Sequence, residues 1–312
     1  MNLSISKTNN KSQSKKNILV LLVFSIIAMT IITKQSIVKN AIEMSLKICI
    51  STIIPSVFPF MILSDYLICN FTIDKDSKLS RLFCKLFSIS SAGVLPFLIG
   101  NICGFPLGAQ MISKLYENGY IDRDEYERLI PLCGNPSVAF VISGVGMGMR
   151  GSIKEGMILY AAIIVSTIIS GVIWQSKKSA SYFCEFSGYS SFSLTSSVKS
   201  AAISSIYISA YIVFFSILIG LAGSFGMTEF VTLILASFLE IGNAASIISR
   251  SEIGNLSLPL TAFSLAFSGI SVYMQVMCFS TPERRNRYYM KIKFTEGVIA
   301  FIITLVLSML IR

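Results

Sequence analysis

Long apolar runs dominate the chain and alternate with short polar stretches. The first run covers 18–32, after a polar stretch at 1–16, and the second covers about 41–63. Further apolar segments follow at 90–118, 130–149, 152–174, 201–225, 228–250, 257–279 and 294–311. A helix of about 20 apolar residues crosses the hydrocarbon core of a bilayer. The pattern therefore predicts an all-α polytopic membrane protein.

Two local features modify this series of helices. Pro55 and Pro59 lie inside the second run and should kink it, because proline cannot donate to the helical hydrogen-bond ladder. The stretch 73–88 is amphipathic, with apolar residues at helical spacing and a basic opposite face that carries Lys75, Lys78, Arg81 and Lys85. This pattern favours a helix in the cytoplasmic membrane interface, and a loop helix that packs on the bundle is the alternative.

The basic residues indicate the orientation. Four lysines within 1–16 place the N-terminus in the cytoplasm. The stretches 177–199 and 284–293 are also basic and should be cytoplasmic, yet three apolar segments, an odd number, separate them. One of the three must therefore enter and leave the membrane on the same side.

An internal repeat indicates which segment re-enters. Residues 108–114 (GAQMISK) resemble residues 244–250 (AASIISR) at an offset of 136. In the first copy, three glycines and a proline within 100–108 interrupt the helix and suit the tip of a re-entrant hairpin. In the second copy, we expect the corresponding break at Gly242 and Asn243.

These assignments predict two halves of opposite orientation, the inverted repeat of many secondary transporters. A cytoplasmic tail at 1–16 and two helices within 17–70 precede them. The first half, 71–175, would hold the interfacial helix, the first hairpin and two spans. The second half, 176–312, would hold a loop, a span, the second hairpin and two spans.

Composition and charge exclude several classes of protein. Only 13% of residues are charged, against roughly 25% in soluble proteins, so the chain is not an ordinary soluble enzyme. The net charge of +10 gathers in short loops, which favours anionic lipid over nucleic acid as the partner. The chain has no histidine, and its seven cysteines lack metal-ligand spacing, so we expect no metal site and no cofactor.

Glu240 is the most informative residue, because an ionisable side chain this deep in an apolar segment is costly. It would bind a solute or a coupling ion, or else brace the hairpin tip. The other candidate substrate-binding side chains are Asn101, Asn135, Asn243, Ser271 and Gln275. The residues expected to shape the backbone are Gly104, Pro106, Gly108, Pro136 and Gly242. Each polar group alone could simply bridge helices, but their joint placement beside two breaks favours a site.

Five motifs in order resemble a known family. They are GFPLGA at 104–109, KLYENGY at 114–120, CGNP at 133–136, EIGN at 240–243 and FSGISVYMQ at 267–275. They are similar to YlbJ-type sporulation integral membrane proteins of the nucleoside-recognition (Gate) group, which is related to concentrative nucleoside transporters. Over about 40–312, the resemblance implies two inverted, hairpin-containing halves and a role in forming the spore cortex. Gly242 and Ser268 depart from the family pattern.

Two functions fit these observations. The first is a transporter or facilitator for a small polar solute, coupled to Na⁺ or H⁺, with Glu240 and the amides at the bilayer midplane. One carboxylate among neutral groups favours a neutral, hydrogen-bonding solute. The alternative is a non-transporting scaffold of the spore envelope, and an enzyme is not predicted. Expected partners are the bilayer, the solute, and either a second copy of the chain or other sporulation membrane proteins.

Overall fold

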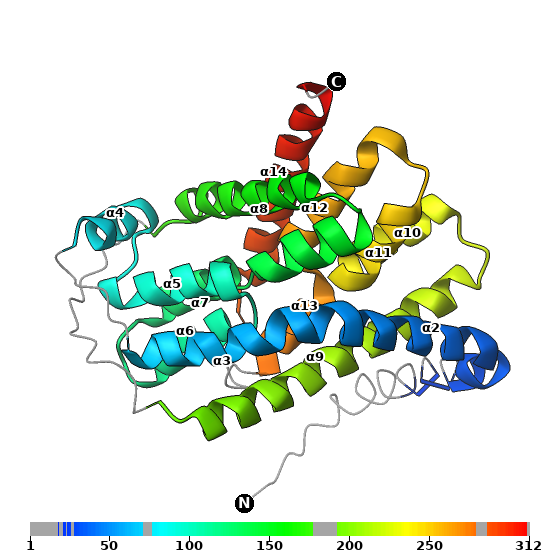
Figure 1. The fold of residues 1–312 in the computed structure, drawn as a ribbon, viewed down its shortest axis with the longest axis horizontal. Coiled ribbons are helices and arrows are strands. Elements are labelled where there is room, and N and C mark those ends of the chain that lie inside the picture. Colours follow the sequence, from blue (N-terminus) through cyan, green and yellow to red (C-terminus); the bar gives the residue numbers. More distant parts are fainter. Residues whose placement is uncertain are drawn as a thin grey trace, which may run out of the picture.

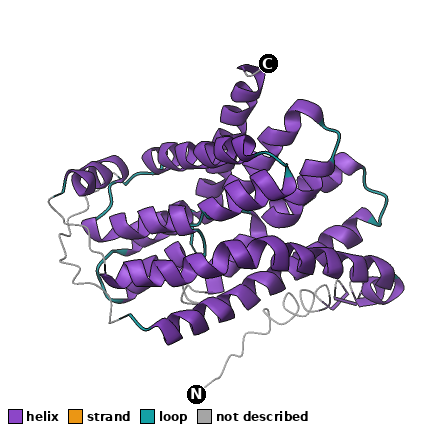
Figure 2. Cartoon of the chain, viewed as in Figure 1, coloured by secondary structure: helices purple, strands orange, loops and turns teal. Residues whose placement is uncertain are grey.

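The computed structural model describes residues 28–70, 77–176, 192–278 and 286–310, together with residues 18, 21, 22, 24 and 25. Within these residues every regular element is a helix, which confirms the all-α prediction (Figure 2). The predicted tail at 1–16 lies outside the described residues, as do 177–191 of the first basic stretch, 284–285 of the second, and part of the first apolar run.

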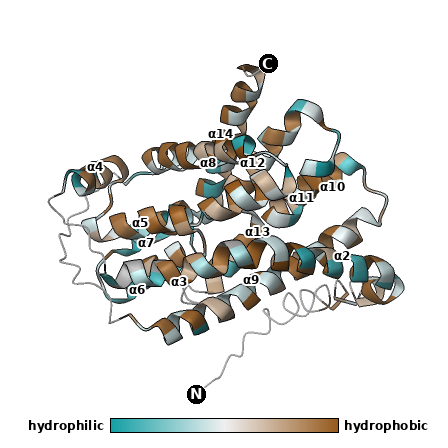
Figure 3. Cartoon of the chain, in the orientation of Figure 1, coloured by the Kyte–Doolittle hydropathy of each residue, from teal (hydrophilic) through white to brown (hydrophobic). Residues whose placement is uncertain are grey.

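Among the described residues, four helical segments are long and apolar enough to cross a membrane (Figure 3). They are α8 (Ile153–Ile173), α9 (Leu194–Gly223), the segment Gly254–Cys278 and α14 (Tyr289–Leu310). Two bent pairs of helices raise the count to as many as six. The chain is therefore a multi-pass membrane protein.

The predicted second span is a bent helix. It comprises α2 (Gln35–Ile48), the π-helical turn η1 (Cys49–Ile53) and α3 (Ile54–Asn70). The parts before and after Ile54–Ser56 are inclined by 41°. Pro55 lies at this break and lacks the N–H that a regular helix needs there, so the kink predicted at Pro55 is confirmed. Pro59, also predicted to kink the helix, lies inside α3.

The amphipathic stretch also forms a helix, α4 (Lys78–Phe87), which begins where the Ser77 side chain accepts a hydrogen bond from the Ser80 N–H. Leu79 and Leu82 are exposed on it, whereas Phe87 is buried and stacks on Phe97. The chain then turns by 88° into α5 (Ser91–Cys103). Placement of α4 in the membrane interface stays a prediction.

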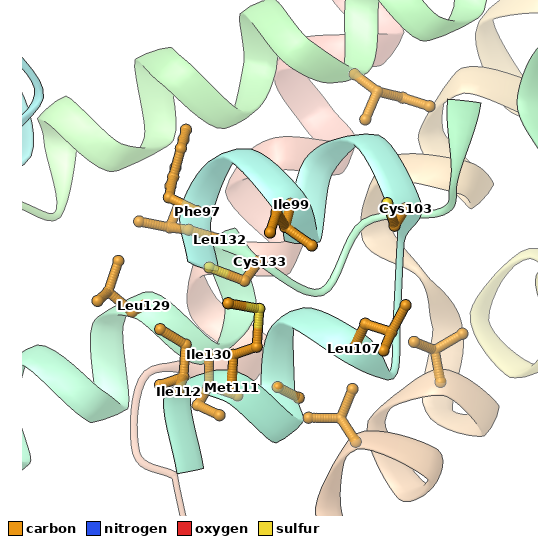
Figure 4. Packing of buried hydrophobic residues seen from close by; sticks show 14 of the residues in the cluster. Phe97, Ile99, Cys103, Leu107, Met111, Ile112, Leu129, Ile130, Leu132 and Cys133 are labelled. Carbon is orange, nitrogen blue, oxygen red and sulfur yellow. The ribbon is translucent and has the colours of Figure 1, made fainter. Parts of the chain in front are cut away.

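The break predicted within 100–108 is present and separates α5 from α6 (Leu107–Glu117), which pack on one another as a helical hairpin, and α7 (Arg123–Leu132) follows. Re-entry of this hairpin into the membrane stays a prediction. Apolar side chains of the three helices interlock beside the hairpin tip (Figure 4). Small residues allow the close approach: a Cβ at Gly100 would lie 2.8 Å, and one at Gly108 2.5 Å, from the Cys133 carbonyl oxygen. The glycines predicted to shape this hairpin thus let it pack directly on the chain after α7.

The predicted span at 130–149 is divided. The end of α7 occupies its start, an irregular stretch follows, and the π-helix η2 (Phe140–Met149) completes it. Ten residues reach about 15 Å, half of a hydrocarbon core, so η2 cannot cross alone. Asn135-Pro136 lies in the irregular stretch, where the sequence predicted an interruption.

The second interrupted segment consists of α10 (Glu229–Leu239) and α11 (Ile241–Arg250). The expected break at Gly242 and Asn243 is wrong by two to three residues, because Glu240 itself is the extended residue and both others lie in the first turn of α11. A further break at Ser268 separates α12 (Ser257–Phe267) from α13 (Gly269–Cys278). In Figure 1, α5–α6 and α10–α11 lie at opposite ends of the molecule.

Candidate functional site

Each interrupted segment packs against an irregular stretch of chain near the centre of the molecule. At the first hairpin, the Phe105 N–H donates to the Asn135 carbonyl oxygen at 2.9 Å. At the second, a Cβ on Gly269 would lie 3.0 Å from the Leu239 carbonyl oxygen. The two irregular stretches touch one another, since the Ser268 hydroxyl donates to the Gly134 carbonyl at 3.2 Å. Four breaks in regular helix therefore converge on one region.

Glu240 is buried, with 1% of its surface exposed, and its carboxylate caps α11. One oxygen accepts from the Gly242 N–H at 2.9 Å, and the other accepts from the Asn243 N–H at 2.6 Å and the Asn243 side-chain amide at 2.7 Å. The positive end of the α11 dipole also favours the negative charge. The carboxylate therefore braces the hairpin tip, as the structural interpretation expects, and it still faces a cavity.

That cavity separates the tip of the second interrupted segment from the first. Glu240 and Ile241 line it from one side, and Phe105, Pro136 and Ser137 line it from the other. Gln275 of α13 also lines it, and the remaining lining residues are apolar: Ile53, Val57, Phe140, Ile208 and Ile212. Its volume of about 20 Å³ admits one water molecule, not a solute. In this conformation the space between the tips is closed.

Gln275 and Ser271 lie on one face of α13, as their spacing predicted. The Gln275 side-chain N–H donates to the Ser271 hydroxyl at 3.1 Å. The amide oxygen of Gln275 is buried and has no hydrogen-bond partner among the described residues. An unpaired buried acceptor costs about 1–3 kcal/mol, so it marks a place where a donor on water or a solute would be stabilised.

Asn101 and Asn135 meet each other rather than the cavity. The Asn135 amide donates to the Asn101 side-chain oxygen at 2.7 Å and to the Thr167 hydroxyl at 2.8 Å. The Asn101 amide in turn donates to the Phe97 and Leu132 carbonyls. The two asparagines therefore tie the first hairpin to the irregular stretch after α7 and to α8.

A buried ion pair lies beside them that the sequence analysis missed. The Lys293 ammonium donates to Glu296 at 2.6 Å and to the Asn135 side-chain oxygen at 2.7 Å. Both charged side chains are fully buried, and the second Glu296 oxygen has no partner among the described residues. The assignment of Lys293 to a cytoplasmic loop is wrong, because α14 begins at Tyr289 and carries the lysine into the core.

The candidate residues thus form two adjoining groups. Glu240, Gln275 and Pro136 line the tip cavity. Asn243 is hydrogen-bonded to Glu240, and Ser271 is hydrogen-bonded to Gln275. Asn101 and Asn135 belong to the network that contains Lys293 and Glu296. The spacing of Lys293 and Glu296, three residues apart at the start of an apolar helix, was the available signal for the missed pair.

One comparison with known proteins found a relative. The chain is 25% identical over 154 residues to the Sporulation integral membrane protein YlbJ of Bacillus subtilis (strain 168). This similarity supports a YlbJ-type family. The match covers 49% of this chain and only 38% of that protein. No protein-family model matches the chain, and no solved structure does.

Proposed function

We propose that this chain is a sporulation-associated membrane protein, not an enzyme, that moves a small polar, nucleoside-like solute needed for the spore cortex. The printed name of the YlbJ relative supports the sporulation role. The predicted inverted repeat, with the N-terminus in the cytoplasm, supports transport, because such halves commonly alternate access to a central site. Na⁺ or H⁺ would be the coupling ion.

One observation carries the transport proposal: a buried carboxylate at a helix break lies beside a small, mainly apolar cavity between two interrupted segments. Irregular backbone at membrane depth is tolerated where it lines a cavity or is buried in protein. Ionisable groups in membrane segments commonly mark solute or ion pathways. The Glu240 carboxylate would accept a hydroxyl of the solute or hold the coupling cation, and the free Gln275 oxygen would accept a second donor.

The closed cavity sets a condition on this mechanism. Ligand pockets for small molecules usually measure about 300–1,000 Å³, far more than the space between the tips. The solute must therefore enter while α10 and α11 move away from Phe105 and Gln275. The hinge for this movement would be the extended Glu240, because the N–H groups of Gly242 and Asn243 bond to its carboxylate and not to the helical ladder.

Uptake into vesicles tests the proposal. Proteoliposomes that contain the wild-type protein should accumulate at least one compound from a panel of nucleosides, amino acids and sugars. Glu240→Gln should reduce this uptake strongly, whereas Glu229→Gln, at the exposed start of the same α10, should leave it unchanged. Wild-type uptake that Glu240→Gln does not alter would remove Glu240 from the mechanism.

The alternative is a scaffold of the spore envelope that transports nothing. The hydrogen bonds from Gly242 and Asn243 to Glu240 favour it, since they give the carboxylate a structural role. A scaffold predicts that a folded Glu240→Gln variant supports sporulation normally, while substitutions on exposed surfaces abolish it. Complementation of a sporulation-defective deletion strain separates the two functions.

A further inference from the structure

A second cavity, much larger than the first, opens between the N-terminal helices and α11. Its volume is about 310 Å³, enough for a small molecule. The polar side chains that line it are Lys47, Ser51, Thr52, Ser246, Ser249 and Arg250. None of the lining residues is acidic.

The two cations give the cavity a positive potential. Lys47 and Arg250 are exposed, and neither forms an ion pair among the described residues. The nearest carboxylate along α2, that of Glu43, pairs with Lys39 at 3.7 Å instead. Two uncompensated cations from separate helices that border one cavity are suited to a shared anion.

The hydroxyl groups extend this chemistry. Ser51 donates to the Lys47 carbonyl at 2.7 Å, and Ser249 donates to the Ser246 carbonyl at 2.9 Å. These are local bonds within one helical turn, and a hydroxyl rotates readily to donate to a better acceptor. A guanidinium, an ammonium and several hydroxyl donors match the three oxygens of a phosphate group, which arginine binds in a bidentate manner.

Both cavities are built on the same two elements. Ser51 and Thr52 of η1 line the large cavity, and the next residue, Ile53, lines the tip cavity. Likewise Ser246 and Arg250 lie toward the end of α11, whereas Ile241 at its start lines the tip cavity. The large cavity therefore lies along the route from the open end of the second interrupted segment to Glu240.

We propose that this cavity, the basic vestibule formed by Lys47, Ser51, Thr52, Ser246, Ser249 and Arg250, binds the phosphate group of a small molecule. The phosphate stays at the two cations, because the Glu240 carboxylate repels it from the tip. The uncharged remainder of the molecule then points toward the tip cavity. Binding itself needs no transport. That the bound compound is also the transported solute rests on the proposed function.

Ligand binding to the purified full-length chain tests the vestibule. Uridine 5′-monophosphate, a probe that carries a phosphate, should raise the thermal unfolding temperature by an amount that grows with the logarithm of its concentration, and uridine should do so far less. Inorganic phosphate should compete with the nucleotide. The double variant Lys47→Gln/Arg250→Gln should weaken binding of the nucleotide at least about tenfold, as expected for loss of charged hydrogen bonds. Added salt should weaken the wild-type complex as well.

Matched controls separate this site from general surface charge. Lys39→Gln removes another exposed cation of α2 that lines no part of the vestibule, so it should leave binding unchanged. A lipid headgroup is a second source of phosphate. Nanodiscs with phosphatidic acid, compared with phosphatidylcholine alone, will show whether the lipid displaces the nucleotide in a manner that depends on Lys47 and Arg250.

The outcomes are distinct. Binding of either phosphate source that the double variant abolishes supports the site and identifies its occupant. Equal stabilisation by uridine and its monophosphate, or equal affinity of wild type and double variant, overturns it. If the vestibule binds phosphate compounds but vesicles take up no compound of the nucleoside, amino-acid and sugar panel, the proposed transport fails while the site stands. If vesicles take up an uncharged solute and no phosphate compound binds, the proposed transport stands while the phosphate site fails.

Discussion

Single residues at the hairpin tips are constrained by close contacts rather than by charge alone. Gly104 combines a φ of +83° with a position at which a Cβ would lie 2.5 Å from the Ser137 backbone nitrogen. A residue with a side chain could keep neither this positive φ nor this close contact unless the hairpin moved. The contact between Gly104 and Ser137 therefore fixes the separation of the first hairpin tip from the irregular stretch after α7.

Gly104→Ala should destabilise the protein by on the order of 3 kcal/mol, because backbone strain and steric overlap add. Gly119→Ala is the matched control. Gly119 also has a positive φ, +74°, but a Cβ there would meet nothing within 4 Å, so only about 1 kcal/mol should be lost. Thermal unfolding in detergent compares the two. Equal losses would show that the overlap with Ser137 does not matter.

The ion pair of Lys293 and Glu296 makes a second prediction at this scale. Removing one partner leaves the other charge buried, so Lys293→Met should cost about 3–5 kcal/mol. The double variant Lys293→Met/Glu296→Met removes both charges and should recover a large part of that loss. Lys291→Met, at an exposed position two residues earlier, should be nearly neutral.

Unfolding of the wild type, Lys293→Met, Glu296→Met and the double variant in one detergent gives the coupling free energy. Additive losses in the double variant would mean that the two side chains do not stabilise one another. Such a result would also contradict the 2.6 Å contact between them.

Helical elements show how far the sequence could lead. Glycine and proline within 100–108 indicate a break by themselves, and the hairpin α5–α6 is where they placed it. Glutamate is a good helix former, so nothing local indicated that Glu240 would be the extended residue. Its role as a cap depends on the donors of Gly242 and Asn243, which only the folded chain presents.

At two other positions the sequence holds a local indication of the structure, but a stronger neighbouring pattern indicates something else. Ser268-Gly269 is a turn-forming pair, yet it lies within a long apolar segment that reads as a continuous span. Lys293 closes a run of basic residues, so positive charge near a membrane end suggested a loop. Its burial follows from two contacts: one with Asn135, which lies 158 positions earlier in the sequence, and one with Glu296, which lies 3 positions later.

The packing of α7 on the start of α5 predicts a dependence on pH. Glu125 of α7, outside the candidate spans, is buried and accepts from the Ser90 N–H and hydroxyl, both at 2.8 Å. Burial raises the pKa of this carboxyl above its ordinary value of 4.5, although the Ser90 hydrogen bonds oppose the shift. Its contribution to stability is thus complete below that ordinary pKa and is lost as pH rises through the raised one.

Glu125→Gln keeps an oxygen that can accept from Ser90 and does not titrate. The variant should therefore show a smaller fall in unfolding temperature from pH 4 to pH 8 than the wild type does. Glu117→Gln, at an exposed position on α6, should leave the wild-type pH profile unchanged. The profile should be measured in one buffer mixture at constant ionic strength. Parallel profiles for wild type and Glu125→Gln would contradict the assignment.

At the scale of the whole molecule, two interrupted segments lie at opposite ends and extend toward a common centre (Figure 1). If both are re-entrant, each has its two ends on one side of the membrane, and the two pairs of ends lie on opposite sides. The open end of α5–α6, opposite its tip, would face the cytoplasm. The open end of α10–α11, together with the basic vestibule, would face outward.

Cysteine labelling tests this topology directly. Thr228→Cys and Glu252→Cys flank α10–α11, and Asn118→Cys follows α6, all at exposed positions. A membrane-impermeant maleimide added to intact cells should label residues 228 and 252 alike and should reach residue 118 only after the membrane is permeabilised. Labelling of the wild-type chain gives the background from its native cysteines. If residues 228 and 252 face different compartments, α10–α11 crosses the membrane, and Glu240 lies within an ordinary broken span. If all three label from outside, the hairpins share one orientation, and alternating access between inverted halves loses its structural basis.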